Sequence, residues 1–306
     1  MIFKEILDAK YQALWPQFEQ LYTLVIDNQT HEGDLLLVRL NAFYKTEVYK
    51  WDNLEYNNPY MFGPNMEGHA ESTHYSFIGH YLKHNTSEKT YEEYLKEVAY
   101  SPDKRVLIDG LTFSESISIQ TEMLIYLKIW ESDIFLKKFW QLIKLTSKDP
   151  YDWHLSVGNS SRSGNLSRDE IIRKKIRNVL KDILPELYAS LKKAYNKQLR
   201  NAIAHSQYSI LGRHIQIHNY IEDDPYSQIK VVAFNDWIDI FHETLAIYEM
   251  YHDFLDIVND NYGQIALSNG NMFPIRVSRE DPIVEIQYLP VYYREFFKDW
   301  NWQPES

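Results

Sequence analysis

The residues best suited to chemistry stand together at 200–205, where Arg-Asn-Ala-Ile-Ala-His places a guanidinium, an amide and an imidazole within about two helical turns. Arg200 is permanently charged, and its planar fork fits phosphate oxygens. An imidazole titrates near neutral pH, so His205 can accept or donate a proton. Asn201 lies four residues before His205 on the same helix face, where it can orient the ring or hold a substrate oxygen. Together these groups could cleave an RNA phosphodiester without a metal.

The same residues also have a purely structural interpretation. A histidine in the last turn of a helix interacts favourably with the helix dipole, and an arginine one turn earlier can pair with an acid. On a straight helix, Arg200 and His205 project roughly 140° apart and converge poorly. One histidine also cannot act as acid and base in the same step. The geometry therefore favours a homodimer whose composite site receives both groups from each of two copies.

The charge distribution around the motif indicates what it binds. The protein has a net charge of −11, yet residues 160–200 carry eleven Lys or Arg and four acids, a local charge of +7. A basic segment in an acidic protein indicates a polyanionic partner, although a solvated helix face explains it equally well. We therefore expect Lys193 and Lys197, before the motif, and Tyr208 and Arg213, after it, to contact substrate.

Regular apolar spacing from about residue 113 predicts the helices that must position the motif. Capping residues and Pro185 give their starts. In chain order we expect helices from Ser114 to Trp130, after Ser132-Asp133, from Ser167 to about Asp182, and from Pro185 to about His205. A hairpin around Leu211-Gly212-Arg213, a short strand at 230–234 and a long helix capped by Asn235 should follow.

In that order, the segment from about 113 to 262 resembles the HEPN superfamily of small helical bundles, in which a helix ends in Arg-polar-x3-His. The residues that carry the resemblance are Arg200, Asn201 and His205. Many members are metal-independent ribonucleases of toxin, anti-phage and RNA-processing systems, and the resemblance implies a homodimer. Other members have no cleavage activity, so the fold alone does not decide the chemistry.

Two functions follow from this resemblance. The first is a metal-independent endoribonuclease, a toxin or defence effector in type, that leaves a 2′,3′-cyclic phosphate and a 5′-hydroxyl. Its expected partners are RNA, a second copy of the chain, and an antitoxin or regulatory protein, with no cofactor or metal. The second is a non-catalytic dimeric module that binds a nucleotide, RNA or a protein.

The remaining regions give weaker signals. A helix over 2–15 ending at Pro16 and a capping box at Thr90 indicate a mainly helical N-terminal region over 1–112. Turn residues stand at Asn57-Asn58-Pro59 and Gly63-Pro64-Asn65. After Gly263, a tail over 263–306 combines a strand at Ile283–Ile286 with an aromatic end. The expected fold is thus mainly α, with a HEPN-like bundle and a short hairpin.

A histidine-rich segment offers the alternative of a metal site. Its acidic and imidazole side chains are Glu67, His69, Glu71, His74, His80 and His84. No recognisable metal motif is present, so scattered surface residues explain the segment more simply. The sequence has no cysteine, which excludes disulfides, thiolate metal sites and cysteine nucleophiles. With no leader-like start and no long apolar run, we expect a cytoplasmic protein.

Overall fold

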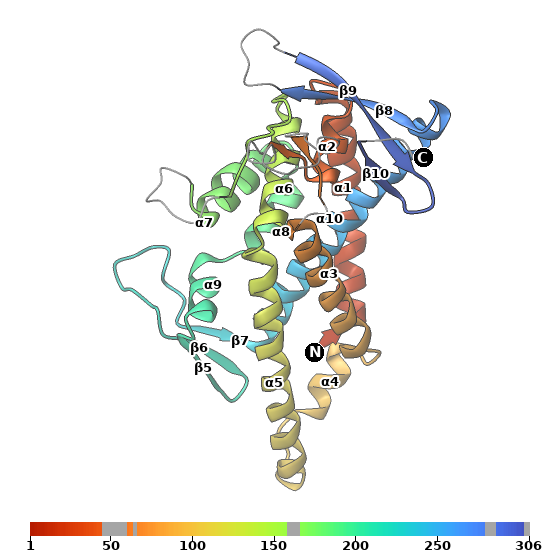
Figure 1. Cartoon of the computed structure of the whole chain (residues 1–306). Helices are drawn as coiled ribbons and strands as arrows, with labels where there is room; N and C mark the ends of the chain where they lie inside the picture. Colours follow the sequence, from red (N-terminus) through yellow and green to blue (C-terminus); the bar gives the residue numbers. More distant parts are fainter. Residues whose placement is uncertain (45–59, 64–65, 158–165, 279–285, 303–306) are drawn as a thin grey trace. The chain divides into compact units, whose positions relative to one another are not determined.

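The computed structural model describes residues 1–44, 60–63, 66–157, 166–278 and 286–302 (Figure 1). Helices predominate, which confirms the mainly helical expectation. The α-helices are α1 (Lys4–Asn28), α2 (Asp34–Leu40), α3 (Met66–Asn85), α4 (Tyr91–Glu97), α5 (Arg105–Trp130), α6 (Asp133–Thr146), α7 (Arg168–Glu170), α8 (Pro185–Ala194), α9 (Lys197–Ala204) and α10 (Phe234–Ser268). Shorter turns are η3 (Pro102–Lys104), the π-helical η5 (Ile171–Arg177) and η6 (Asn178–Lys181).

The strands form small separate sheets. They are β1 (Ile2–Phe3), β2 (Phe43–Tyr44), β3 (Tyr60–Met61), β4 (Thr86–Ser87), β5 (Tyr208–Leu211), β6 (His214–Ile217), β7 (Val231–Ala233), β8 (Met272–Ser278), β9 (Ile286–Arg294) and β10 (Asp299–Asn301). Strands β5, β6 and β7 form an antiparallel sheet, as do β8, β9 and β10. β1 pairs with β4 in parallel, and β2 pairs with β3 antiparallel.

The chain divides into two compact units, each assembled from three separate segments. Unit 1 contains Met1–Gln17, Thr73–Ser132 and Leu180–Met250. Unit 2 contains Phe18–Ser72, Asp133–Val179 and Tyr251–Ser306. Helices α1, α3 and α10 each continue from one unit into the other. This division follows contacts and cuts across the expected segments 1–112, 113–262 and 263–306, whose status as domains stays a prediction.

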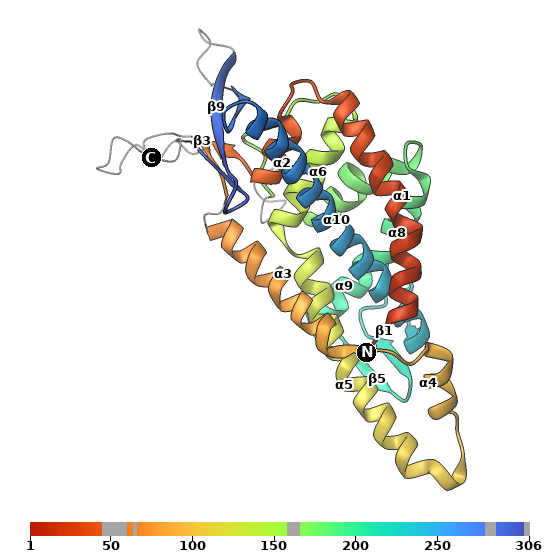
Figure 2. The same cartoon turned by 90° about the vertical axis from the view of Figure 1, so that its right-hand side faces the viewer.

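The core of unit 1 lies where α5 packs on the first part of α10. The rings of Tyr126 and Trp237 lie 5.6 Å apart, and Trp237 stacks on Phe241. Trp130, at the end of α5, is buried and packs on Tyr195, which follows α8. Figure 2 shows α4 as the neighbouring helix along the first turns of α5. Aromatic side chains therefore fill much of this unit's interior.

Unit 2 is built around α2 and α6, whose apolar side chains are buried. Leu35, Leu36, Leu37 and Val38 are inaccessible to solvent, so this uninterrupted apolar run is a core helix. Phe135 of α6 packs edge-on against Tyr251, with ring centroids 4.9 Å apart. Of the C-terminal strand expected at Ile283–Ile286, only Ile286 is described, and it is the first residue of β9. The turn residues Asn57-Asn58-Pro59 and Pro64-Asn65 also lie outside the described ranges.

Several local expectations are confirmed. Thr90 with Glu93, and Ser167 with Glu170, form reciprocal capping boxes. The hairpin pairs Leu211 with His214 across a turn in which Gly212 has a φ of +56°, and β7 supplies the third strand. The helical segment that starts after Ser167 continues to Lys181 through a π turn rather than as a regular α-helix.

The expected boundaries of three helices are wrong. Helix α5 begins at Arg105, not Ser114, and α1 continues through Pro16 to Asn28. Helix α10 begins one residue before Asn235 and continues beyond Gly263 to Ser268. A Cβ atom at Gly263 would lie 2.7 Å from the Tyr293 ring, so this glycine allows a close contact rather than ending the helix.

Candidate functional site

The motif lies on α9, which is separate from the preceding helix. The expected single helix from Pro185 to His205 is wrong, because α8 ends at Ala194 and α9 begins at Lys197. Between them Asn196 has extended backbone angles, and its side chain accepts a hydrogen bond from the Leu199 N–H at 2.9 Å. Asn196 therefore acts as an N-cap and starts a new helix for the motif.

Arg200 is anchored by a carboxylate that sequence reasoning missed. Its Nη1 atom lies 2.9 Å from Oε1 of Glu131, which follows the last turn of α5, and 17% of its side chain is exposed. The Nε atom of Arg200 is buried and donates no hydrogen bond within the described residues. The guanidinium thus has donor capacity beyond the Glu131 pair.

His205 occupies the cap position at the end of α9, where its side chain is exposed. Its backbone leaves the helical region, so the straight-helix estimate of its direction does not apply. Ser206 follows with a φ of +53°, in the left-handed region. The N–H groups of His205, Ser206 and Gln207 donate to the carbonyls of Asn201, Ile203 and Ala202 at 3.0, 3.2 and 2.7 Å, respectively. The last two bonds form a Schellman cap, which fixes the backbone that carries the imidazole.

The four expected substrate contacts have different environments. Lys193 forms ion pairs with Asp239 and, at 3.9 Å, with Glu243. Lys197 is exposed at the start of α9, and Tyr208 is half-buried at the start of β5. Lys193 therefore belongs to a charge-balanced cluster.

Arg213 connects the hairpin to α5 and α4. Its guanidinium binds both oxygens of Glu115, at 2.9 and 2.8 Å, and donates to the Tyr91 hydroxyl at 3.0 Å. It also lies over the rings of Tyr94 and Phe234. Glu115 is buried, so this bidentate pair holds the hairpin turn against the rest of unit 1.

The basic segment at 160–200 is partly neutralised by neighbouring acids. Arg162 lies outside the described ranges, and the described residues of the segment divide between the two units at Val179. In unit 2 the ion pairs are Arg168 with Asp133, Arg173 with Asp169, and Lys174 with Glu170. Asp169 and Glu170 belong to the segment and are already counted in its charge of +7, so of these three acids only Asp133 lowers the charge available to a polyanion.

The histidine-rich segment forms most of α3. His80 and His84 are neighbours on this helix, with ring centroids 4.3 Å apart. Glu71 instead accepts a hydrogen bond from Lys138 of α6 at 2.6 Å, and this lysine is buried. Over the ranges that the structure covers, no group of three potential ligands is placed to hold a metal ion.

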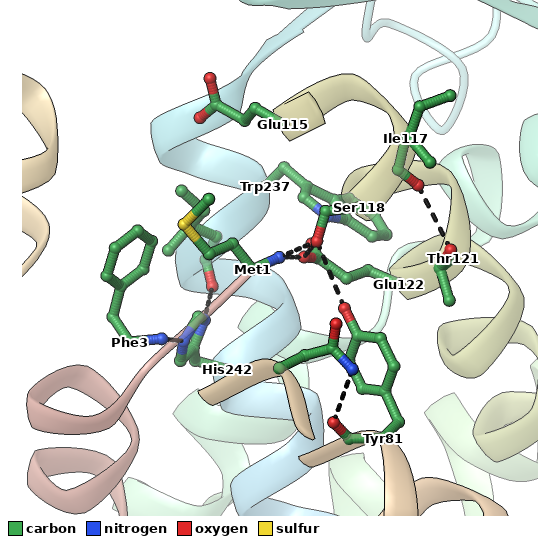
Figure 3. Close-up of polar contacts among 12 residues, drawn as sticks. Met1, Phe3, Tyr81, Glu115, Ile117, Ser118, Thr121, Glu122, Trp237 and His242 are labelled. Carbon is green, nitrogen blue, oxygen red and sulfur yellow. Dashed lines mark hydrogen bonds and ion pairs between the residues drawn. The ribbon is translucent and has the colours of Figure 1, made fainter. Parts of the chain in front are cut away.

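A second concentration of polar side chains lies inside unit 1, between α3, α5 and α10 (Figure 3). The carboxylate of Glu122 accepts hydrogen bonds from Trp237 Nε1 at 2.7 Å and from the Ser118 hydroxyl at 2.9 Å. The amino group of Met1 contacts both Ser118 and Glu122, and Tyr81 lies 3.4 Å from Ser118. These mutual bonds satisfy buried groups and give the cluster a structural role.

His242 lies beside this cluster and is fully engaged. Its Nε2 accepts a hydrogen bond from the Phe3 N–H at 2.9 Å, so its Nδ1–H donates to the Ile238 carbonyl at 2.7 Å. Burial lowers the pKa of His242 to about 4. The ring is therefore neutral near pH 7 and has no free nitrogen for proton transfer.

The described helices include none with a stretch long and apolar enough to cross a bilayer. In comparisons with known proteins, no family model matches the chain, and neither a curated protein nor a solved structure is detectably similar to it. The resemblance to the HEPN superfamily thus rests on Arg200, Asn201, His205 and the order of the surrounding elements.

Proposed function

We propose that this protein is a metal-independent endoribonuclease and that Arg200, Asn201 and His205 form its site. The observation that carries the proposal is the setting of the motif: an exposed imidazole on a fixed helix cap, close in sequence to a partly buried guanidinium. Such a pair combines a proton carrier with a cation for phosphate. The most basic part of the sequence precedes it.

The reaction is a transesterification within the RNA chain. The 2′-oxygen attacks phosphorus while the bond from phosphorus to the 5′-oxygen breaks. A base takes the proton of the 2′-hydroxyl, and an acid gives a proton to the leaving 5′-oxygen. His205 serves one of these roles, and Arg200 stabilises the charge that develops on the phosphoryl oxygens. The Asn201 amide holds a substrate oxygen or orients the imidazole.

One chain supplies one histidine from this motif, whereas the reaction moves two protons. A homodimer with a composite site supplies the second imidazole from His205 of the other copy. Mixing wild-type protein with His205→Ala, under conditions of subunit exchange, tests this point. If the site is composite, a mixture of equal amounts of the two chains retains a quarter of the wild-type activity, because only dimers with two intact histidines cleave RNA. A site within one chain retains half.

The decisive experiment measures cleavage of labelled RNA in EDTA. His205→Ala and Arg200→Ala should each reduce the rate at least about 100-fold, with 2′,3′-cyclic phosphate and 5′-hydroxyl ends on the wild-type products. His84→Ala and Arg105→Ala are matched controls, because both side chains are exposed outside the motif and should leave the rate unchanged. Equal rates in all five proteins would assign cleavage to a contaminant and reject the proposal.

The Glu131 pair favours a second candidate, a non-catalytic module that binds RNA or a nucleotide. A phosphate that binds Arg200 competes with this carboxylate for the guanidinium. Such a module would bind RNA in a manner that depends on Arg200 and salt, yet would leave the RNA intact. Binding lost in Arg200→Ala, with no cleavage by the wild-type protein, would select this candidate.

A further inference from the structure

Helix α5 has an apolar face that nothing in unit 1 covers. Val106 is 87% exposed, Phe113 67%, Ile117 50% and Leu124 60%. The opposite face of the same helix is buried in the unit's core, with side chains that include Ile119, Met123 and Tyr126. Four large apolar side chains exposed on one helix form a patch of the kind that often marks an interaction site.

The four residues belong to two interleaved lines with seven-residue spacing. One line contains Val106, Phe113 and Gln120, and the other contains Gly110, Ile117 and Leu124. This spacing is that of the a and d positions of a coiled coil. The pattern is also symmetric about residue 115, because Val106 and Leu124 are equally far from that point, as are Phe113 and Ile117. We call these six residues the α5 stripe.

We propose that the α5 stripe binds the α5 stripe of a second copy of this chain, with the two helices antiparallel. A twofold axis near residue 115 then pairs Phe113 with Ile117 of the second copy and Val106 with Leu124. It also pairs Gly110 with Gln120, so the side chain of Gln120 faces the position that has no side chain. Because the α5 stripe has the same pattern of positions when read from either end, it can pair with the same stripe of a second copy, as an isologous interface requires.

The antiparallel direction follows from the ends of the helix. In a parallel pair, Lys104 and Arg105 of the two copies would lie together at the N-terminus and repel each other. Gly110 would also face Gly110 and leave a gap next to two facing Phe113 rings. The antiparallel pair removes both costs and aligns the helix dipoles favourably. Ser114 and Ser116, near the axis, are small enough to permit close approach.

The exposed area is appropriate for a dimer. The stripe and the neighbouring Leu107, which is also exposed, form an apolar patch on the order of the 300–600 Å² that is the largest on a typical monomer. A standard interface buries about 800 Å² on each partner, so the stripe supplies most of its apolar centre. Polar residues along the edges of α5 supply the rim.

This contact is independent of the proposed nuclease site. Glu131, which holds Arg200, lies sixteen residues from the centre of the stripe, or about 24 Å along the helix. The antiparallel pair therefore places the two motifs at opposite ends and does not itself form the composite site. A chain that makes both contacts has two different twofold interfaces, so its assembly contains more than two copies.

The first test measures mass in solution by sedimentation. The wild-type chain at micromolar concentration should have at least twice the 36.6 kDa mass of one chain. Phe113→Glu with Ile117→Glu should weaken the α5 contact at least about tenfold, because four charges would enter one apolar seam. Leu211→Glu is the matched control, since Leu211 is an exposed leucine of unit 1 outside the stripe. A wild-type monomer, or an unaltered mass in the double variant, would overturn the proposal.

The second test uses introduced cysteine pairs. The native sequence contains no cysteine, so any thiol crosslink must join the introduced residues. A mixture of Val106→Cys and Leu124→Cys chains should give a covalent heterodimer with a short thiol crosslinker. Neither variant alone should crosslink, because identical positions lie about 27 Å apart in the antiparallel pair. Efficient crosslinking of Val106→Cys with itself would show a parallel pair. Absence of any crosslink in the mixture would reject the proposed α5 contact.

Discussion

Acid should weaken this protein through His242, whose two ring nitrogens are engaged while the ring is neutral. The unfolded chain exposes the imidazole to water, where its pKa returns to about 6.5. In the folded chain burial lowers that pKa to about 4. Because the folded state binds the proton less readily, the stabilisation is complete above pH 6.5 and is lost as the pH falls from 6.5 towards 4.

The size of the effect follows from the two pKa values. Lowering the pH to 5 protonates most unfolded chains and few folded ones, which costs about 2 kcal/mol of unfolding free energy. The loss should reach a limit of about 3 kcal/mol below pH 4. His242→Gln removes the titration and retains the hydrogen bonds, because the Gln amide can accept from Phe3 and donate to Ile238.

Urea unfolding, followed by tryptophan fluorescence from pH 7.5 to 4.5, measures this effect. The wild-type protein should lose about 2 kcal/mol more than His242→Gln between pH 7 and pH 5. Burial also lowers the pKa of His252, to about 3, but His252 is present in both proteins and cancels in the difference. His84→Gln, at an exposed position, should follow the wild type. Parallel curves for the wild type and His242→Gln would refute the reasoning.

Three further substitutions test other contacts. Gly263→Ala should lower the unfolding free energy by about 1–3 kcal/mol, because the new Cβ meets the Tyr293 ring at 2.7 Å; an unchanged urea midpoint would contradict this. Ser206→Gly should raise it by about 0.5–1 kcal/mol, since φ is +53° there, and a lower melting temperature would count against it. Glu131→Gln should tighten RNA binding by Arg200 and steepen its salt dependence, whereas weaker binding would make Glu131 a positioning residue.

Features that depend on neighbouring residues could be predicted from the sequence. The capping boxes at Thr90 and Ser167 require side chains three residues apart, and the hairpin requires alternating apolar residues around Gly212. In each case the stabilising contact and its signal lie within a few positions. The position of His205 at a helix end belongs to the same class.

Features that depend on tertiary contacts could not be predicted from the sequence. The partner of Arg200 is Glu131, which is far from it in the sequence, so no local pattern connects the two residues. The break at Asn196 was concealed because apolar spacing continues across it, although Asn is a recognised N-cap. Gly263 resembled a helix end because its true reason, the Tyr293 ring, lies elsewhere in the chain.

The start of α5 illustrates a further limit. The sequence predicts its start at Ser114, because serine is a common N-cap residue. Between Arg105 and Phe113, the side chains of Val106, Leu107 and Phe113 are exposed, so they do not follow the face buried in unit 1. A helix whose apolar residues point towards another molecule does not match a rule that assumes a core within its own chain.

The interleaving of the two units determines when this protein can fold on the ribosome. Unit 1 needs both Met1–Gln17 and the segment that ends at Met250, so it cannot close until most of the chain has been synthesised. At about 5–20 residues per second, the first segment waits for tens of seconds with Ile2 and Phe3 without their final partners. During synthesis, protection of these apolar side chains falls to chaperones, and fragments that end before Met250 are expected to aggregate or be degraded.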